Sequence, residues 1–358
     1  MILEGTPKNT RNAGSPRAPS WVLSALSKAL ARAPQTGGKP LEYRRLASAL
    51  CASALLASGV ALAATEAAPA RLAPKPGQDA ATEQSDVEAW RAKRLTNLKS
   101  DTGWLTLAGL FWLKDGENTF GSDASSSLRL ENPALAANAG SFVKSGEKVR
   151  FVAGKGGGIT HEGKPVTSVD MVPDSDAHPT ILESGSLSFF VIERAGRYGV
   201  RLRDKANPHR ANFRGLEYFP IRTDWVFNAR FEPYEPRRHI KIINILGMEE
   251  NMDSPGALVF DKDGREWRLD TILEEPDADE LFVMFADATS GKETYGAGRF
   301  MYLELPQDGY VKVDFNKAYN PPCAFNDFAT CPLPPFQNRL ALRVDAGEKN
   351  YAPSSHTR

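Results

Sequence analysis

The stretch ALVFDKDGREWRLDTIL, residues 257–273, carries the clearest fold signal in the chain. An Asp263–Gly264 pair separates two apolar runs, one around Phe260 and one around Trp267. Such a pair is typical of a two-residue β-hairpin turn, because both turn positions need a positive φ that Asp and Gly tolerate. The stretch therefore predicts two antiparallel strands.

The same pattern recurs on both sides of this hairpin. SLSFFVIERAGRYGVRLRD, residues 186–204, predicts a second hairpin that turns at Ala195–Gly196, and WVFNARF, residues 225–231, alternates apolar and polar positions. Further short apolar runs are KVRFVAG, HIKIINILG, LFVMFAD, RFMYLEL, YVKVDF and RLALRV. No strand–helix alternation is present. The sequence predicts a mainly β fold, an antiparallel sandwich or barrel-like architecture in two β domains with one N-terminal helix.

The predicted helix comes before the strands. Residues 75–84 have the composition of a linker, and Ser85 or Asp86 can cap a following helix. Apolar residues then recur at helical spacing at Val87, Trp90, Leu95 and Leu98. We expect this helix to pack on the first β domain. Residues 104–113 are strongly apolar, and periodicity leaves open whether they form a strand or a buried helix.

The domain organisation that these patterns predict has five parts. They are an N-terminal extension with a signal peptide at 1–63, a linker at 64–84, the helix with the first β domain at 85–215, a second β domain at 216–350, and a tail at 351–358. A single continuous β architecture is the alternative to two domains.

The signal peptide is predicted from an apolar run. LASALCASALLASGVALA, residues 46–63, follows Arg44 and Arg45 and ends in an Ala-x-Ala cleavage pattern. A membrane anchor is the alternative, but the run is short for a span and rich in Ala and Ser. We therefore expect export to the periplasm or secretion, with no stable membrane span after cleavage.

Charge and motif content exclude several function classes. The whole chain has 44 basic and 44 acidic residues, and the predicted leader takes eight basic and two acidic residues, which leaves 36 against 42. Without a basic stripe, nucleic acid is a poor partner. Nucleotide-binding P-loop, GxSxG and HExxH patterns are absent. The sequence predicts no cofactor and no metal.

Two cysteines follow the leader, Cys323 and Cys331. In an oxidising compartment they can form a disulfide, which is our prediction. A free catalytic thiol at Cys323 is the alternative. A metal site is disfavoured because no histidine lies near either cysteine in sequence.

The C-terminal third resembles a known family. The carrying motifs are TYGAGRF at 294–300, DFNKAYNPPCAF at 314–325, CPLPPFQNRL at 331–340 and AGEK at 346–349. Together with GWLTLAGLFWLKDGENTFGSD at 103–123, they resemble the bacterial family called domain of unknown function 1684, over roughly residues 85–350. The resemblance implies a conserved domain and no particular activity.

The YGAGR motif is a candidate anion site. Gly296 and Gly298 permit positive φ and close backbone approach, and Arg299 can hold a carboxylate or phosphate with two hydrogen bonds. The alternative is a glycine turn before a strand, with Arg299 paired to a structural acid.

The candidate catalytic residues are Asp314, Glu348 and Tyr295. Asp314 ends a predicted strand and can act as a general base if its surroundings shift its pKa, and Glu348 follows the strand-like RLALRV. Tyr295 can donate a proton or a hydrogen bond. The alternatives are a turn-capping Asp314 and an ion-pair network bridged by Arg299.

The proline-rich stretch 318–340 is predicted to be rigid, because proline fixes φ and restricts the residue before it. Its polar residues are candidates for ligand binding, namely Asn316, Tyr319, Asn320 and Asn338. Such a loop can be the wall of a ligand site or can cover a sheet edge.

Two functions from different classes follow. The first is an exported β-rich module that binds a small polar or anionic ligand. The second is a metal-independent hydrolase-type enzyme that uses Asp314 or Glu348 with Tyr295 and Arg299. We favour binding, because the sequence contains no recognisable pair of nucleophile and base.

Overall fold

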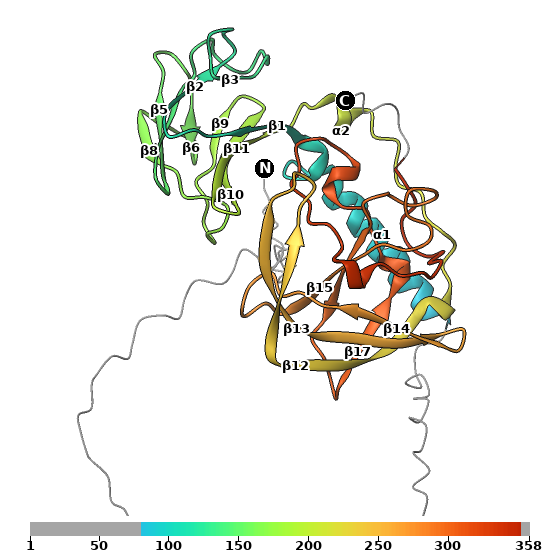
Figure 1. The fold of residues 1–358 in the computed structure, drawn as a ribbon. Helices are drawn as coiled ribbons and strands as arrows, with labels where there is room; N and C mark the ends of the chain where they lie inside the picture. Colours follow the sequence, from blue (N-terminus) through green and yellow to red (C-terminus); the bar gives the residue numbers. More distant parts are fainter. Residues whose placement is uncertain (1–79, 352–358) are drawn as a thin grey trace, which may run out of the picture. The chain divides into compact units, whose positions relative to one another are not determined.

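The computed structural model describes residues 80–351, and these form a mainly β protein of several antiparallel sheets with one long helix near the N-terminus (Figure 1). The helix is α1 (Ala80–Lys99), and one further single-turn helix is α2 (Pro208–Ala211). None of the sheets described is a closed barrel, since each has two edge strands. The predicted fold class is confirmed, and its barrel-like variant is not realised.

Two sheets occupy residues 107–204. The six-stranded sheet has the order β1 (Leu107–Trp112), β11 (Arg197–Asp204), β10 (Leu187–Arg194), β9 (Leu182–Ser184), β6 (Thr160–His161) and β7 (Lys164–Pro165). The five-stranded sheet has the order β3 (Leu128–Arg129), β2 (Gly116–Gly121), β4 (Gly140–Ser145), β5 (Lys148–Ala153) and β8 (Ser168–Asp170). The segment left open by periodicity is therefore a strand, entered through a 3₁₀ turn at Trp104–Thr106.

These two sheets share one apolar core. Phe120, Phe142 and Phe151 come from the five-stranded sheet, and Phe189 comes from β10 of the other sheet. The four rings contact one another with centroids 5.0 to 6.2 Å apart. Side chains that alternate along each strand thus meet between two sheets, which is the packing of a β-sandwich.

Residues 226–314 form a four-stranded and a two-stranded sheet. The first has the order β14 (Arg265–Asp270), β13 (Glu249–Lys262), β12 (Val226–Ile243) and β17 (Tyr310–Asp314), and the second pairs β15 (Glu280–Phe285) with β16 (Arg299–Glu304) (Figure 1). The predicted Asp263–Gly264 turn joins β13 to β14, with φ of 58° and 77° at its two positions. The predicted turn at Ala195–Gly196 likewise joins β10 to β11.

A second apolar core lies among these strands and the C-terminal segment. Phe315, directly after β17, is fully buried at its centre and contacts the rings of Trp225, Phe227, Phe260 and Phe285. Val344 and Ala346 from the C-terminal segment complete it. The residues of the two cores come from separate parts of the chain, and the predicted division into domains at 85–215 and 216–350 stays a prediction.

Helix α1 differs from the prediction in its start and its packing. It is already helical at Ala80, so residues 80–84 are not linker, and Ser85 and Asp86 lie inside the helix instead of capping it. The sequence AATEQ is a good helix former, and this outweighs the capping signal. The helix contacts the C-terminal half of the chain, through Lys312 to Glu83 and Arg94 to Glu348, and its C-terminal end also contacts the predicted first β domain, where Arg210 Nε donates to the carbonyl of Lys99.

One predicted strand is wrong. The run RLALRV, residues 339–344, forms only an isolated bridge from Arg339 to Ala286 and is otherwise irregular. Its apolar residues Leu340 and Val344 are buried in the second core without pairing along a strand. Alternating apolar residues indicate that one side of an extended chain is buried. An irregular segment that packs on a core can show the same pattern without being a strand.

Several predictions fall outside residues 80–351. They are the signal peptide, the Arg44–Arg45 pair and the cleavage pattern at 61–63, together with most of the linker and the tail. Between residues 80 and 351, no helix is long and apolar enough to cross a membrane.

Cys323 and Cys331 lie at disulfide distance, with Cα atoms 6.2 Å apart. The two residues are eight positions apart, and closing so short a loop stabilises a fold by about 2.6 kcal/mol in the chain-entropy account.

We expect reduction of the Cys323–Cys331 disulfide to lower the free energy of unfolding by about that amount. Urea unfolding with and without a reductant measures it, with Cys331→Ser as the matched variant, and a reductant effect that persists in Cys331→Ser would contradict the assignment.

Candidate functional site

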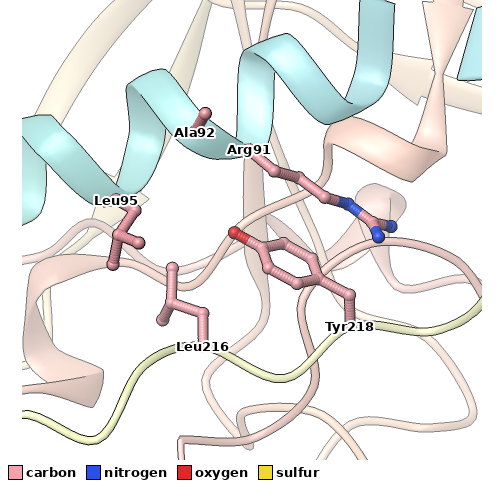
Figure 2. Close-up of a pocket in the computed structure, with 5 residues that line it drawn as sticks. All are labelled: Arg91, Ala92, Leu95, Leu216 and Tyr218. Carbon is pink, nitrogen blue, oxygen red and sulfur yellow. The ribbon is translucent and has the colours of Figure 1, made fainter. Parts of the chain in front are cut away.

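A shallow pocket of about 180 Å³ lies between α1 and the segment that precedes β12. Figure 2 shows its five lining residues, with Arg91, Ala92 and Leu95 on the helix and Leu216 and Tyr218 on the facing segment. Most of the lining is aliphatic or aromatic carbon, and the polar atoms belong to Arg91 and Tyr218. The pocket thus combines an apolar wall with one cationic group.

Arg91 is held in place by its neighbours, but not all of its N–H donors have a hydrogen-bond partner. Its guanidinium carbon lies 4.1 Å from the ring centroid of Tyr218, and Nη2 donates to the carbonyl of Phe219 at 3.1 Å. Its Nε is buried without a hydrogen-bond partner. Burial lowers the pKa of Arg91 from its usual value, against the opposing effect of Tyr218 and Asp314, but an arginine remains charged in a protein. The group therefore has a spare donor and a positive charge.

Tyr218 links this pocket to a buried ion pair. Its hydroxyl donates to Glu348 Oε1 at 3.5 Å, and the same oxygen accepts from Arg94 Nε at 2.9 Å. Burial and the charge of Glu348 raise the pKa of Tyr218 above its usual value. The phenol is consequently neutral at physiological pH, and it acts as a hydrogen-bonding group and not as a base.

Two of the sequence-predicted residues, Glu348 and Asn320, meet at this ion pair. Glu348 Oε2 accepts from the backbone N–H of Asn320 at 2.9 Å, and the Asn320 side chain donates to the carbonyl of Lys349 at 2.7 Å. Arg94 Nη2 donates to the Asn320 carbonyl at 3.0 Å. Glu348 is fully buried, and both of its oxygens are paired. In this arrangement Glu348 accepts hydrogen bonds from groups of the protein that are themselves held in place.

Arg299 is enclosed completely. Its side chain has no exposed surface. Nη2 pairs with Asp287 at 3.3 Å and donates to the carbonyl of Val344 at 3.0 Å. Nη1 donates to the carbonyl of Ala346. These contacts tie the C-terminal segment to β16. A ligand could reach Arg299 only if that segment moved, so a structural role explains the observed contacts, whereas ligand binding by Arg299 stays a prediction.

Of the two glycines of the YGAGR motif, Gly298 serves close packing. Gly298 has a φ of 96°, and a Cβ at this position would lie 2.5 Å from the carbonyl oxygen of Phe285 and 2.6 Å from Pro334 Cγ. Gly296 is not among the positive-φ glycines. The turn therefore needs glycine at residue 298 because β15 and the proline-rich stretch approach it closely.

Asp314 is buried and only partly paired. Its Oδ1 caps the following 3₁₀ turn by accepting from the backbone N–H of Asn316 at 2.9 Å. Its Oδ2 has no hydrogen-bond partner and lies 3.7 Å from Lys317 Nζ. Burial raises the pKa of Asp314 above its usual value, more than the bonds from Asn316 and the charge of Lys317 lower it. The residue combines the predicted cap with the unpaired oxygen that a general base needs.

This raised pKa has a consequence for stability. The folded state binds the Asp314 proton more tightly than the unfolded state does. Protonated Asp314 therefore adds to the free energy of unfolding at low pH, and this addition is lost as the pH rises from about 3.8 through the raised pKa. We expect Asp314→Asn to remove this pH-dependent loss of stability, because asparagine does not titrate but keeps the oxygen that caps the 3₁₀ turn. Urea unfolding between about pH 3 and pH 8, which covers the usual titration range of a carboxyl group and the range above it, measures the difference. The exposed Asp308→Asn is the control, and parallel pH profiles for Asp314→Asn and the wild type would contradict the expectation.

The other predicted residues are spread over the fold. Tyr295 donates from its hydroxyl to the carbonyl of Cys323 at 3.1 Å. Tyr319 packs in an apolar cluster with Phe282 and Phe300. Asn316 and Asn338 bond backbone groups, Asn316 at Arg222 and Asn338 at Asp270 and Met284. The structure brings Asn320 to Glu348 and Asn316 to Asp314, and Arg299 Nη1 also donates to the backbone carbonyl of Glu348 at 3.5 Å.

Sequence reasoning missed Arg91, Arg94 and Tyr218. The signal was in the helix, where Val87, Arg91, Arg94 and Leu98 follow the spacing 4, 3, 4 that places residues on one face. We assigned Leu95 to the buried face, yet it is 38 % exposed and lines the pocket. A long basic side chain can cover apolar surface at an inward-facing helical position in the same way as an apolar side chain.

No group of three or more His, Cys, Asp or Glu side chains within residues 80–351 has an arrangement that could hold a metal ion. The described residues of the pocket also contain no glycine-rich phosphate loop. The chemistry available at the pocket is therefore ion pairing, hydrogen bonding and apolar contact.

The comparisons with known proteins agree with the sequence resemblance. No curated protein matches the chain. Among solved structures it is similar to an uncharacterized protein of Haloarcula marismortui determined by solution NMR, with 34% identity over 39% of this chain and 78% of that chain and a TM-score of 0.34. The family described as "Protein of unknown function (DUF1684)" matches residues 211–349, so residues 85–210, which we also expected to resemble it, lie outside the match. The chain belongs to the DUF1684 family.

Proposed function

We propose that the protein is an exported binding module for a small ligand with a short apolar body and one negative charge. The ligand lies in the pocket between α1 and Leu216–Tyr218, with its charge at Arg91. The observation that carries this proposal is the buried, unpartnered Nε of Arg91 in a pocket that is otherwise apolar. Export is supported by the leader sequence and by two cysteines at disulfide distance.

The size of the pocket limits the ligand. At about 180 Å³ it is smaller than the pockets of roughly 300–1,000 Å³ that hold drug-sized molecules. Because the pocket is shallow, a larger ligand such as a nucleotide or an oligosaccharide would extend beyond it into solvent. A branched or cyclic carboxylate of a few carbons fits such a volume.

The charge of the pocket selects the sign of the ligand. Arg91 brings a fixed positive charge, and Glu348, the carboxylate that Tyr218 contacts, is already paired with Arg94. A ligand carboxylate would accept from the free Nε–H and gain a charge-assisted hydrogen bond, which is about twice as strong as a neutral one. The Leu95 and Leu216 side chains would cover its apolar body.

Isovalerate is a suitable probe, and isovaleramide is its neutral isostere. We expect isovalerate to bind the wild-type chain more tightly than isovaleramide, and Arg91→Gln to weaken isovalerate binding roughly 10- to 100-fold, since a hydrogen bond to a charged group contributes about 1.5–3 kcal/mol. Isothermal titration calorimetry measures both. Lys93→Gln removes an exposed charge from the same helix and is the matched control. Equal affinity for the two probes, or an unchanged affinity in Arg91→Gln, would refute the proposal.

One observation supports the hydrolase-type alternative. Asp314 is buried with a raised pKa and an unpaired Oδ2, and a raised carboxyl pKa is one feature of a general base. If it is a general base, turnover of an activated ester such as p-nitrophenyl acetate should follow a pH profile that Asp314→Asn abolishes. Wild-type turnover no faster than that of Asp314→Asn at every pH would exclude Asp314 as the base.

A further inference from the structure

Arg94 occupies a cage of complementary groups. Its Nε donates to Glu348 Oε1 at 2.9 Å and its Nη2 to the carbonyl of Asn320 at 3.0 Å. Its guanidinium carbon also lies 4.6 Å from the ring centroid of Trp104, 4.7 Å from that of Tyr319 and 5.8 Å from that of Phe325. A carboxylate, a carbonyl and three aromatic rings around one cation are the elements of a cation-binding site.

The polar wall of this cage is held by the C-terminal segment and not by the helix that fills it. Glu348 is held from its other side by the backbone N–H of Asn320, whose side chain is in turn fixed on Lys349. Tyr319 and Phe325 belong to apolar clusters that α1 shares, since Trp90 packs against the first cluster and Leu98 belongs to the second. Without Arg94, the fully buried Glu348 would lose the cation that is bonded to it and keep only the weaker interactions with Arg91 and Arg299, which is unfavourable. The cage therefore demands a cation.

The helix that supplies the cation is attached largely through polar contacts. Only Val87 and Leu98 of its apolar residues are fully buried, with Trp90 packed at the edge of a cluster. Two buried polar atoms of the helix have no partner, Glu83 Oε1 and Arg91 Nε. Each such atom costs free energy in the docked state. An interface of this kind favours exchange with a competing ligand over permanent burial.

We infer that the cage is a guanidinium-binding site, which Arg94 fills in the docked state and which a small alkylguanidinium ligand fills in competition with α1. The planar guanidinium suits this cage, because it donates to a carboxylate and a carbonyl in its plane while its faces contact aromatic rings. The inference goes beyond the proposed anion pocket, since it concerns a different residue of α1 and a ligand of opposite charge.

Ethylguanidinium is the probe, and ethylammonium is the matched cation without the planar group. The tethered Arg94 competes at an effective concentration on the order of millimolar. We therefore expect ethylguanidinium to bind the full-length Arg94→Ala chain at least roughly tenfold more tightly than the wild type. Calorimetric titration measures both affinities. Lys93→Ala, which removes an exposed cation one position away, should behave as the wild type.

A second variant separates the cage from any other site. Adding Glu348→Gln to Arg94→Ala should abolish the ethylguanidinium binding. Equal binding to the wild type and to Arg94→Ala, no binding to folded Arg94→Ala, or equal binding of ethylammonium would each overturn the inference. If Arg94→Ala does not fold alone, refolding in ethylguanidinium replaces the titration: recovery with that ion and not with ethylammonium supports the site, and failure with both overturns it.

Discussion

Replacing Arg299 with methionine is expected to lower the free energy of unfolding by about 3–5 kcal/mol, the usual effect of removing one partner of a buried ion pair. Asp287 would keep its charge at a site with no exposed surface. The carbonyls of Val344 and Ala346 would each lose a donor. Because domains unfold with a total of about 5–15 kcal/mol, this single change should remove much of the stability.

Urea unfolding of Arg299→Met measures that loss, and Arg343→Met is its control. Arg343 lies in the same C-terminal segment and pairs with Glu293, but both side chains are about half exposed, so its removal should cost at most about 1 kcal/mol. Adding Asp287→Asn to Arg299→Met should recover part of the loss by removing the uncompensated charge. Equal effects of the two arginine variants would contradict the structural role of Arg299.

Phe315→Ala should destabilise the protein to a similar extent, by about 3–5 kcal/mol. The ring is fully buried and contacts four other aromatic rings, including those of Trp225 and Phe285. Truncation to alanine leaves a cavity that these large, mutually fixed rings fill only in part. The loss should spread to the capped turn that begins at Asp314, because Phe315 is the first residue of that turn.

Phe336→Ala is the matched control, since the Phe336 side chain is 88 % exposed. Its removal should change the free energy of unfolding by less than about 0.5 kcal/mol. Thermal unfolding of the two variants gives the comparison directly. A loss for Phe315→Ala no larger than that for Phe336→Ala would mean that residue 315 is not at the centre of a packed core.

The hairpins could be predicted because their determinants are local. Asp263–Gly264 fixes its turn through the φ values that these two residues accept, and the flanking apolar residues then fix which face is buried. RLALRV shows the limit of the same reasoning. Its apolar residues are buried as expected, but its backbone has only a few bonds to residues 286–288, such as Leu340 N–H to the Ala286 carbonyl, and these do not extend into a strand.

The candidate site could be predicted only in part, for a related reason. Asn320 and Glu348 are 28 positions apart in sequence, and the motifs placed both near the site without showing that they meet. Arg299 looked like a ligand-binding arginine because a sequence does not distinguish an exposed guanidinium from one enclosed by carbonyls. Arg91 and Arg94 looked like solvent-facing charges on a helix, whereas partners more than 100 residues away bury them.

Mapping the binding of isovalerate by amide chemical shifts in solution is the most direct test of the proposed function. The proposal predicts saturable shifts at residues 91–95 and 216–218, which line the pocket, and their loss in Arg91→Gln but not in Lys93→Gln. Shifts confined to residues 287–299, around the enclosed Arg299, or no saturable shifts at all, would contradict it.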